Sequence, residues 1–363
     1  MARCRSLQCS GFAALGVEPV WRRRYIRRPF ARPPVPVTIP TPSNFDTEPP
    51  KDGVPTALDS TPATRRQPAP NIRPHDPATG SVLSELLEVA TDFWHYRELV
   101  YQLTRRDIRI RYTQAVMGFA WAIFMPIFIV AAGVLVRFAM ANLSGTHLQL
   151  SGIAGIVVKA LPWSFFVGSI GFAASSLVGN SNLVAKVYFP REILPLSVML
   201  AQGFDTLIST TAVAAILLIV GLKVSFATLW VVPLGLLLLA FTIGAGLFVS
   251  CTNLFFRDVK YIVQVLVTFG IFLTPVFFEP SMFGPVGAQA MMLNPLAPIL
   301  EGLRLAVVDH HNLLEPLVLA TPKGEVLAWS PWYLAYAGVI SIGGLIGAAV
   351  TFHRLEQLFA EYV

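Results

Sequence analysis

The stretch Gly179-Asn-Ser-Asn-Leu-Val-Ala-Lys-Val-Tyr-Phe-Pro-Arg-Glu-Ile-Leu-Pro195 is a short polar loop between two long apolar segments. It is long enough for one short helix with its connections. It carries Lys186, Arg191 and Glu192 in a region where most residues are apolar. A membrane protein that exposes little mass outside the bilayer must contact other proteins through such loops. We therefore predict that this chain is the membrane part of a machine whose motor is a different polypeptide.

The composition predicts an all-α polytopic membrane protein. Of the 363 residues, 54% are hydrophobic and 13% are charged, and the mean hydropathy is +0.61. A soluble domain has about 25% charged residues. Apolar runs of about 20 residues are long enough to cross the hydrocarbon core of a bilayer. These values argue against a soluble globular core.

The net charge of +6 belongs to residues 1–80, where 12 Lys and Arg accompany 6 Asp and Glu, whereas residues 81–363 contain 15 of each. The basic balance therefore gives no reason to expect a nucleic-acid partner. Residues 1–80 also hold 15 of the 28 prolines, and proline at this density prevents regular helices and sheets. We predict a disordered Pro/Arg-rich extension that is either dispensable or a tail for anionic lipid. It has no apolar run of the kind that a signal peptide needs.

Two further segments follow the extension. Residues 81–112 are predicted to form an amphipathic cytoplasmic interface region, because 83–103 has apolar residues on one helical face and arginines follow it. Residues 113–363 are predicted to form a six-helix transmembrane domain, and 281–330 to hold re-entrant or outer gate helices because proline interrupts its apolar residues. Ten basic residues fall on one side of the spans and five on the other, which predicts that both termini are cytoplasmic. The predicted spans are 115–141, 153–178, 193–222, 226–251, 261–280 and 331–352.

Several kinds of chemistry are missing from the sequence. There is no Gly-Lys dipeptide and hence no P-loop, so we expect no nucleotide to bind this chain. The cysteines and histidines lack the spacing of a disulfide framework or a metal site, and we expect neither a metal nor a bound cofactor. Asp205 is a carboxylate well inside a predicted span. Such a group suggests a function by default, and the alternative is a structural hydrogen bond to a neighbouring helix.

An ordered set of motifs carries a resemblance to a known family. From about Trp94 to Val363 the chain resembles the membrane permeases of type-2 ABC exporters for polysaccharides and polyol phosphates, which export O-antigen, capsule and teichoic acid. The motifs are Arg105-Arg106-Asp107-Ile-Arg-Ile-Arg111-Tyr112, Met117-Gly118-Phe-Ala-Trp121, Leu161-Pro162-Trp163-Ser-Phe-Phe166, the loop Asn182–Pro195, Phe256-Arg257-Asp258-Val-Lys-Tyr261, Leu273-Thr-Pro275-Val, Leu293-Asn294-Pro295 and Glu301-Gly302.

The resemblance implies a homodimeric permease in the bacterial inner membrane that moves a lipid-linked glycan, most simply O-antigen. A separate ABC ATPase subunit, in two copies, would use ATP and Mg. The resemblance also implies roles for particular residues. ATPase coupling would involve Asn182, Leu183, Lys186, Tyr188, Phe189, Pro190, Arg191, Glu192, Arg257 and Asp258. The inner-interface headgroup site would use Arg105, Arg106, Arg109 and Arg111. Candidate channel aromatics are Tyr112, Trp121, Phe165, Phe166, Phe172, Phe269 and Phe272.

Other functions remain open at this point. The same architecture fits a type-2 ABC exporter of a drug or small lipid, whose cavity would be lined by aliphatic side chains instead of sugar-stacking aromatic rings. A membrane-embedded glycosyl transferase would need paired acidic residues or a metal triad, which the sequence does not show. A proton-driven carrier would depend on Asp205 and would work without an ATPase.

Overall fold

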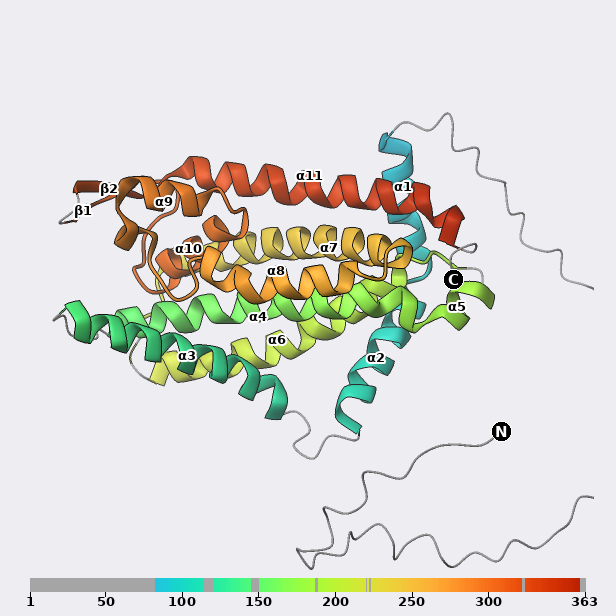
Figure 1. Ribbon diagram of the computed structural model, residues 1–363, viewed down its shortest axis with the longest axis horizontal. Helices are drawn as coiled ribbons and strands as arrows, with labels where there is room; N and C mark the ends of the chain where they lie inside the picture. Colours follow the sequence, from blue (N-terminus) through green and yellow to red (C-terminus); the bar gives the residue numbers. More distant parts are fainter. Residues whose placement is uncertain are drawn as a thin grey trace, which may run out of the picture. The chain divides into compact units, whose positions relative to one another are not determined.

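The computed structural model describes residues 82–113, 120–144, 150–186, 189–219, 221, 223–321 and 324–359. The predicted extension 1–80 and the beginning of the predicted 115–141 span lie outside these residues. The described part is mostly helical. Its long helices run side by side, and short elements gather at the two ends of the bundle (Figure 1).

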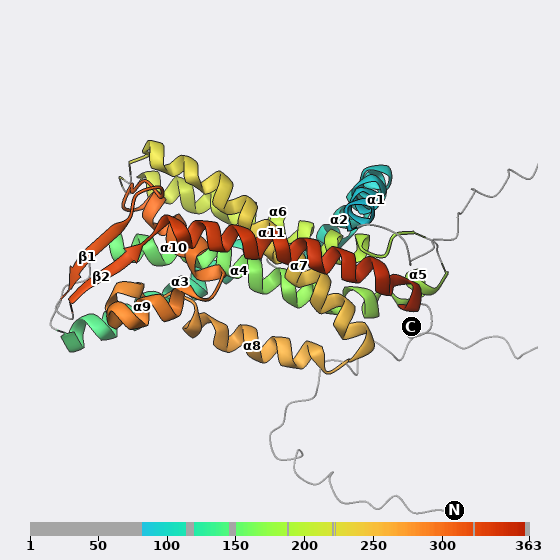
Figure 2. The same ribbon diagram turned by 90° about the horizontal axis from the view of Figure 1, so that it is seen from above.

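Two helices precede the bundle. α1 (Val82–His95) and α2 (Arg97–Thr113) meet at Tyr96, whose N–H still donates to the Asp92 carbonyl at 2.9 Å. The sequence predicted one amphipathic helix over 83–103 with arginines after it. Instead, the arginines belong to α2 itself, which continues through them to Thr113. Both helices cross the end of the bundle at a steep angle to the long helices (Figures 1 and 2).

Four helical segments are long and apolar enough to cross a membrane. They are α4 (Leu150–Gly179), α6 (Ile193–Ile219), the 30-residue segment that joins η2 (Phe226–Trp230) to α7 (Val231–Phe255), and α11 (Pro331–Leu355). α11 begins with a proline at its first position, where the missing N–H costs no hydrogen bond. These segments match four of the six predicted spans.

The other two predicted spans coincide with α3 (Ala120–Ser144) and α8 (Val259–Leu273). Their strongly apolar parts are shorter, at Ile127–Asn142 and Val259–Leu273. The sequence predicted that the fifth span would continue to residue 280, but α8 ends at Leu273. Thr274 is extended because the following Pro275 disfavours helical backbone before it. No residue of α8 is buried.

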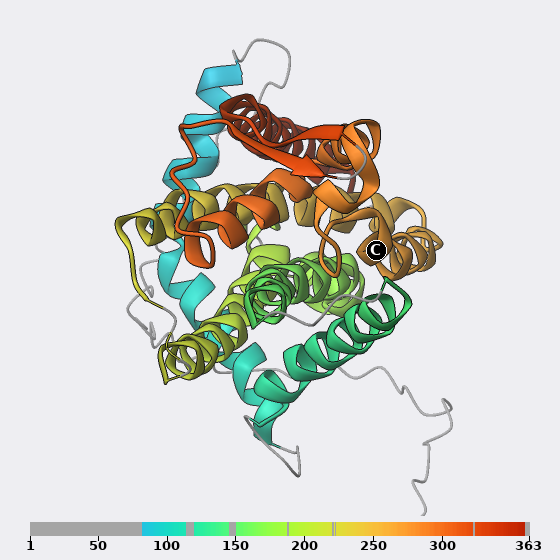
Figure 3. The ribbon, with the colours of Figure 1, turned by 90° about the vertical axis from the view of Figure 1, so that its left-hand side faces the viewer.

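The segment that the sequence marked as gate helices folds into short elements at one end of the bundle. They are η3 (Pro280–Phe283), α9 (Gly284–Met292), α10 (Leu296–Val307) and an antiparallel hairpin of β1 (Leu317–Thr321) and β2 (Gly324–Trp329). Every residue of α10 from Leu296 to Ala306 is buried. Seen end-on, α10 lies among α4, α7 and α11 (Figure 3). The hairpin departs from the predicted all-α fold.

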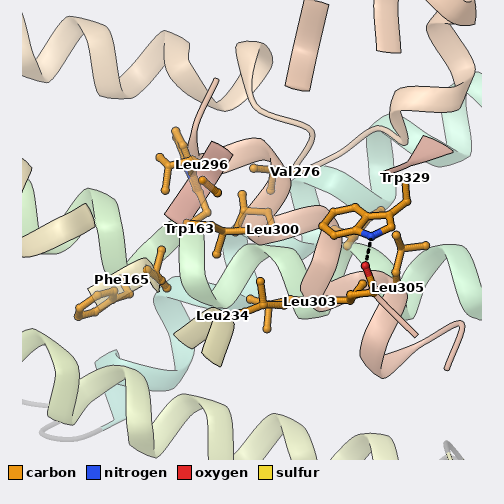
Figure 4. Packing of buried hydrophobic residues seen from close by; sticks show 14 of the residues in the cluster. Trp163, Phe165, Leu234, Val276, Leu296, Leu300, Leu303, Leu305 and Trp329 are labelled. Atoms are coloured by element: carbon orange, nitrogen blue, oxygen red, sulfur yellow. Dashed lines mark hydrogen bonds between the residues drawn. The ribbon is translucent and has the colours of Figure 1, made fainter. Parts of the chain in front are cut away.

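Two hydrophobic clusters hold the bundle. The first surrounds α10, where Leu300 and Trp329 are fully buried near Trp163 (Figure 4). The Trp329 indole Nε1 donates to the Leu313 carbonyl at 2.8 Å, which satisfies the one polar atom of that side chain. The second cluster lies near the C-terminus and joins residues of α2, α4, α6, α7 and α11 to residues around α5 (Ser181–Lys186).

Candidate functional site

The end of the bundle that carries α5 brings together segments far apart in the sequence. We call it the α5 end. It contains α5, α1, α2, the turn between α7 and α8, and the end of α11 (Figure 1). Val184 and Phe189 from the loop around α5 are buried here against Phe352 and Phe359 from the C-terminal segment. The loop is therefore packed onto the bundle on its inner side.

Arg191 fastens this loop to the C-terminal segment. Its backbone N–H donates to the Glu356 carboxylate at 2.8 Å, and its Nη1 donates to the Glu356 carbonyl at 2.6 Å. The guanidinium also lies over the Phe359 ring, with its central carbon 5.9 Å from the ring centre. Both the main chain and the side chain of Arg191 thus hold η4 (Glu356–Leu358) against the start of α6.

Glu192 is largely buried beside Arg191. Its Oε1 lies 3.8 Å from His353 Nδ1 and makes no hydrogen bond. Burial, together with the nearby carboxylates of Glu356 and Asp92, raises the pKa of Glu192 to about 8. Burial also raises the pKa of Glu356, although its hydrogen bond from Arg191 acts in the opposite direction. Glu192 therefore holds a proton near neutral pH.

The surface of the α5 end comes from other residues. Asn182 on α5 is exposed, and Leu183 is half-buried against the second cluster. Arg257 and Asp258 are exposed in the turn between α7 and α8. Tyr188 and the Lys186 side chain lie outside the described part. Three of the predicted coupling residues are therefore exposed, namely Asn182, Arg257 and Asp258. Phe189 is buried, and Arg191 and Glu192 are partly buried against the bundle.

The four α2 arginines divide into two pairs. Arg106 binds Asp107 at 2.9 Å and the Asn180 side-chain oxygen at 3.3 Å, which ties α2 to the residue after α4. Arg111 points to α6. Arg105 and Arg109 are one helical turn apart and exposed. This second pair is open to an anionic ligand.

Asp205 is the centre of a polar cluster between α2, α4 and α6. Its carboxylate accepts hydrogen bonds from Arg111 Nη1 at 2.7 Å and from the Tyr112 hydroxyl. Arg111 Nη1 also donates to Gln202 at 3.0 Å, and its guanidinium lies 3.9 Å from the centre of the Phe172 ring. Asp205 is 8% exposed. The intramembrane carboxylate is therefore bound to a neighbouring helix, as the structural alternative predicted.

The candidate channel aromatics are in different environments. Phe165 is buried in the first cluster, and Phe166 stacks on Phe241 with ring centres 5.8 Å apart. Tyr112 and Phe172 belong to the Asp205 cluster. The other three candidates are exposed. They are Trp121 on α3 and Phe269 and Phe272 on α8.

A buried ion network at the opposite end was missed by the sequence interpretation. We call it the α10 network. Glu301 accepts from Arg304 at 2.6 Å and from Lys159 at 3.4 Å, and Arg304 also binds Asp309 at 2.7 Å. Lys159 donates to the Phe278 carbonyl at 2.8 Å. The signal in the sequence was Lys159, a lysine inside the apolar run of the predicted span 153–178.

A second pair joins the same end of the bundle. Arg137 on α3 binds Glu279, after α8, at 2.7 Å. Within the described ranges, no group of three or more His, Cys, Asp or Glu side chains has the geometry of a metal site. The charged groups of this end therefore serve to connect α3, α4, α10 and the segment after α8 to one another.

Comparison with known proteins shows the family to which this chain belongs. Residues 98–308 match the family model described as ABC-2 type transporter. The chain is 26% identical over 265 residues to the O-antigen export system permease protein RfbA of Klebsiella pneumoniae, covering 73% of this chain and 94% of that protein. It is 27% identical over 253 residues to the RfbA protein of Myxococcus xanthus, covering 68% and 94%. The family match spans more than half of the chain, which therefore belongs to the ABC-2 type transporter family.

Proposed function

We propose that this protein is the permease subunit of an ABC exporter that moves O-antigen, or a similar lipid-linked glycan, across the bacterial inner membrane. The observation that carries the proposal is the similarity to O-antigen export permeases over nearly their full length. The family and the apolar helices make the chain a multi-pass membrane protein of the transporter class. The finer features, namely six spans, cytoplasmic termini and a homodimer, are part of the proposal.

ATP hydrolysis belongs to a partner in this proposal. An ABC transporter needs an ATPase, and this chain contains no P-loop. We propose a separate nucleotide-binding subunit in two copies. The homodimer is proposed from the resemblance to this class of exporter, and α8, which has no buried residue, is the helix that we propose for the contact with the second copy.

The α5 end fits the surface on which such an ATPase would act. α5 and its flanking residues are packed against the second cluster and fastened to the C-terminal segment through Arg191. A push on the exposed side of α5 would therefore reach α6, α11 and α2 together. The exposed turn at Arg257 and Asp258 supplies a second contact on the same end. These features support α5 as a coupling helix that transmits nucleotide-driven closure.

The headgroup site is proposed at Arg105 and Arg109. A diphosphate needs cations that are not already neutralised, and guanidinium groups bind phosphate oxygens well. Arg111 and Arg106 are engaged with Asp205 and Asp107. Of the four predicted arginines, the exposed pair is therefore the better binder, and the engaged pair would hold α2 in place.

Charge reversal on the exposed turn tests the coupling proposal. Arg257→Glu with Asp258→Lys should reduce surface glycan at least tenfold, because the altered turn no longer fits the ATPase while the bundle keeps its packing. The measurement is quantitative immunoblotting of surface glycan in a strain that lacks the wild-type gene. Glu325→Lys on β2, also exposed, is the matched control at the opposite end. Full export by the double variant, at normal protein levels, would remove the turn from the coupling surface.

Variants of the loop around α5 are expected to act differently. Glu192→Lys, or a flexible linker in place of residues 182–191, should also abolish export. Glu192 is mostly buried and Phe189 belongs to the second cluster. These variants would therefore detach the loop from the bundle, whereas the variants of the exposed turn alter only a surface. Limited proteolysis should then show a newly cleavable site at the loop. An intact loop with full export would contradict the assignment.

A further inference from the structure

An apolar groove of about 540 Å³ lies between α6 and α7, on the half of the bundle away from α5. Its floor is formed by buried side chains of three elements, Phe165 from α4, Leu238 from α7 and Leu303 from α10. Its rim includes Leu207 and Val224, which are 64% and 71% exposed. The groove therefore opens sideways, toward the space that lipid occupies around a membrane-spanning bundle.

The groove has the dimensions of one lipid chain. It runs along α6 from Gly203 to Leu218, which is about 22 Å at 1.5 Å per residue. Half of a bilayer, including its headgroup layer, is about 20–22 Å thick. A phospholipid with its headgroup at the α6–α7 loop would place an acyl chain along this whole length. A polyprenyl carrier is several times longer and would extend far beyond the groove.

Polar groups are few in the groove. Thr206 Oγ1 donates to the Gln202 carbonyl at 3.0 Å, and Thr228 Oγ1 accepts from the Ser225 N–H at 3.3 Å. The third hydroxyl, that of Thr210, is on the exposed part of α6. Most of the remaining lining is hydrocarbon, which suits an acyl chain better than a glycan, whose hydroxyl groups need hydrogen-bond partners.

A single cation stands at one end of the groove. Lys223 lines it beside Val224 and is exposed. In the part of the chain that the structure describes, Lys223 makes no ion pair. A lysine at a membrane surface attracts an anionic lipid headgroup. The groove therefore offers a cation for a lipid phosphate, at Lys223, and an apolar lining for an acyl chain.

We propose that this groove binds one anionic phospholipid, of the phosphatidylglycerol type, with its phosphate on Lys223 and one acyl chain between α6 and α7. The site is separate from the α5 end, and it does not depend on what the protein exports. A bound lipid would fill the space between α6, α7 and α10 and so stabilise their arrangement.

The glycines of the groove allow a clean test. A Cβ added at Gly235, which lines the groove, would meet no atom within 4 Å, so Gly235→Leu is a substitution that places a side chain at the groove without straining the backbone. Gly171 on α4 has equally open surroundings and does not line the groove, which makes Gly171→Leu the matched control. Lys223→Glu reverses the charge at the mouth. Lys260→Glu reverses an exposed lysine at the other end of the bundle.

The experiment is native mass spectrometry of the full-length protein, taken from nanodiscs of phosphatidylethanolamine doped with phosphatidylglycerol. Wild type and both controls should retain phosphatidylglycerol in preference to phosphatidylethanolamine. Lys223→Glu should reduce the retained phosphatidylglycerol by about fivefold or more, as expected for the loss of one lysine contact. Gly235→Leu should also reduce it, because the added side chain occupies space in the groove that the acyl chain needs.

Three results would overturn the proposal: equal retention of the two lipids by wild type, undiminished phosphatidylglycerol in both groove variants, or a polyprenyl phosphate as the retained lipid when it is added to the nanodiscs. If Gly235→Leu fails to fold, Lys223→Glu still decides, because an exposed charge change leaves the core unaltered. Because the readout is lipid retention, failure here would leave the export proposal untouched.

Discussion

The pairing of Asp205 with Arg111 changes the interpretation of this carboxylate, which lies well inside a predicted span. A lone carboxylate at membrane depth suggests proton or ion transfer. Here its two oxygens are occupied by Arg111 and Tyr112, and Gln202 shares the same arginine. The side chains of Arg111 and Asp205 are 18% and 12% exposed. The cluster therefore joins α2 to α6, and we expect it to be structural.

Removal of one partner should cost stability. Asp205→Asn leaves Arg111 without its counter-charge in a mostly buried place, which costs about 3 kcal/mol. Asp258→Asn, on the exposed turn, is the control and should cost about 0.5 kcal/mol or less. Thermal unfolding in detergent measures both, and Arg111→Gln added to Asp205→Asn should recover part of the loss. An Asp205→Asn protein with wild-type stability but no export would instead favour the proton-driven carrier.

Glu192 predicts a pH dependence of stability. Its pKa in the folded protein is about 8, above the value of about 4.3 for an exposed glutamate. Between these two values the folded state binds one more proton than the unfolded state, so stability falls as pH rises from about 4.3 to about 8. Deprotonation then leaves a buried, poorly hydrated charge beside the Glu356 and Asp92 carboxylates.

Glu192→Gln should remove this dependence, because glutamine resembles the protonated acid. We expect the variant to gain about 2–4 kcal/mol over wild type at about pH 9 and much less at about pH 5. Thermal unfolding across this range gives the difference at each pH. A difference that stays constant with pH would show that Glu192 titrates normally.

At the scale of elements, the C-terminal segment, residues 352–359, packs against the loop around α5 and holds it in place. Phe359 is fully buried between Phe352 and Phe255, and Glu356 receives both hydrogen bonds from Arg191. Phe359→Ala should destabilise the protein by about 3–5 kcal/mol and should release the loop to proteolysis. Leu358→Ala, at a side chain that is 42% exposed, is the neighbouring control. Equal protease sensitivity of the two variants would separate the C-terminal segment from the loop.

The α10 network should be equally sensitive. Glu301 is 1% exposed and faces both Lys159 and Arg304. Glu301→Gln leaves two cations with no carboxylate between them, and we expect a loss of about 3–5 kcal/mol. Glu315→Gln, an exposed carboxylate of the same end, should be neutral. If thermal unfolding finds the two variants alike, the network does not hold α10 in place.

Some elements could be predicted from sequence and others could not. Long apolar runs fixed α4, α6, α7 and α11 within a few residues, because hydrophobic length is a strong signal. The hairpin of β1 and β2 was missed although Pro322-Lys323-Gly324 is a turn signal. In a chain dominated by helices, two short strands with apolar residues were interpreted as part of a gate helix.

The candidate site was predictable in outline only. Motifs placed the coupling residues in two loops, but they could not show that Arg191 and Glu192 turn inward to Glu356 and His353, residues more than 150 positions away. Likewise, one sequence cannot pair Arg111 with Asp205 or Lys159 with Glu301. These contacts depend on helix rotation and crossing, which hydrophobic patterns in an all-round apolar helix do not specify.

At the scale of the whole molecule, the two ends have different constructions. The α5 end combines a packed loop with exposed charge at Arg257 and Asp258, and the opposite end contains the buried helix α10 and its ion network. The described bundle leaves α8 with only unburied residues. A half-transporter that works within a larger assembly is expected to have these features. The α5 end offers an exposed surface to a partner, the opposite end is packed around α10, and α8 has no buried residue.

The most direct measurement compares glycan at the cell surface with lipid-linked glycan inside the cell after deletion of this gene. The account predicts that surface glycan is lost and lipid-linked polymer accumulates inside, and that the wild-type gene restores export while the Arg257→Glu, Asp258→Lys variant does not. Unchanged surface glycan, in a strain with no second exporter, would contradict the account and favour a drug or small lipid as the cargo.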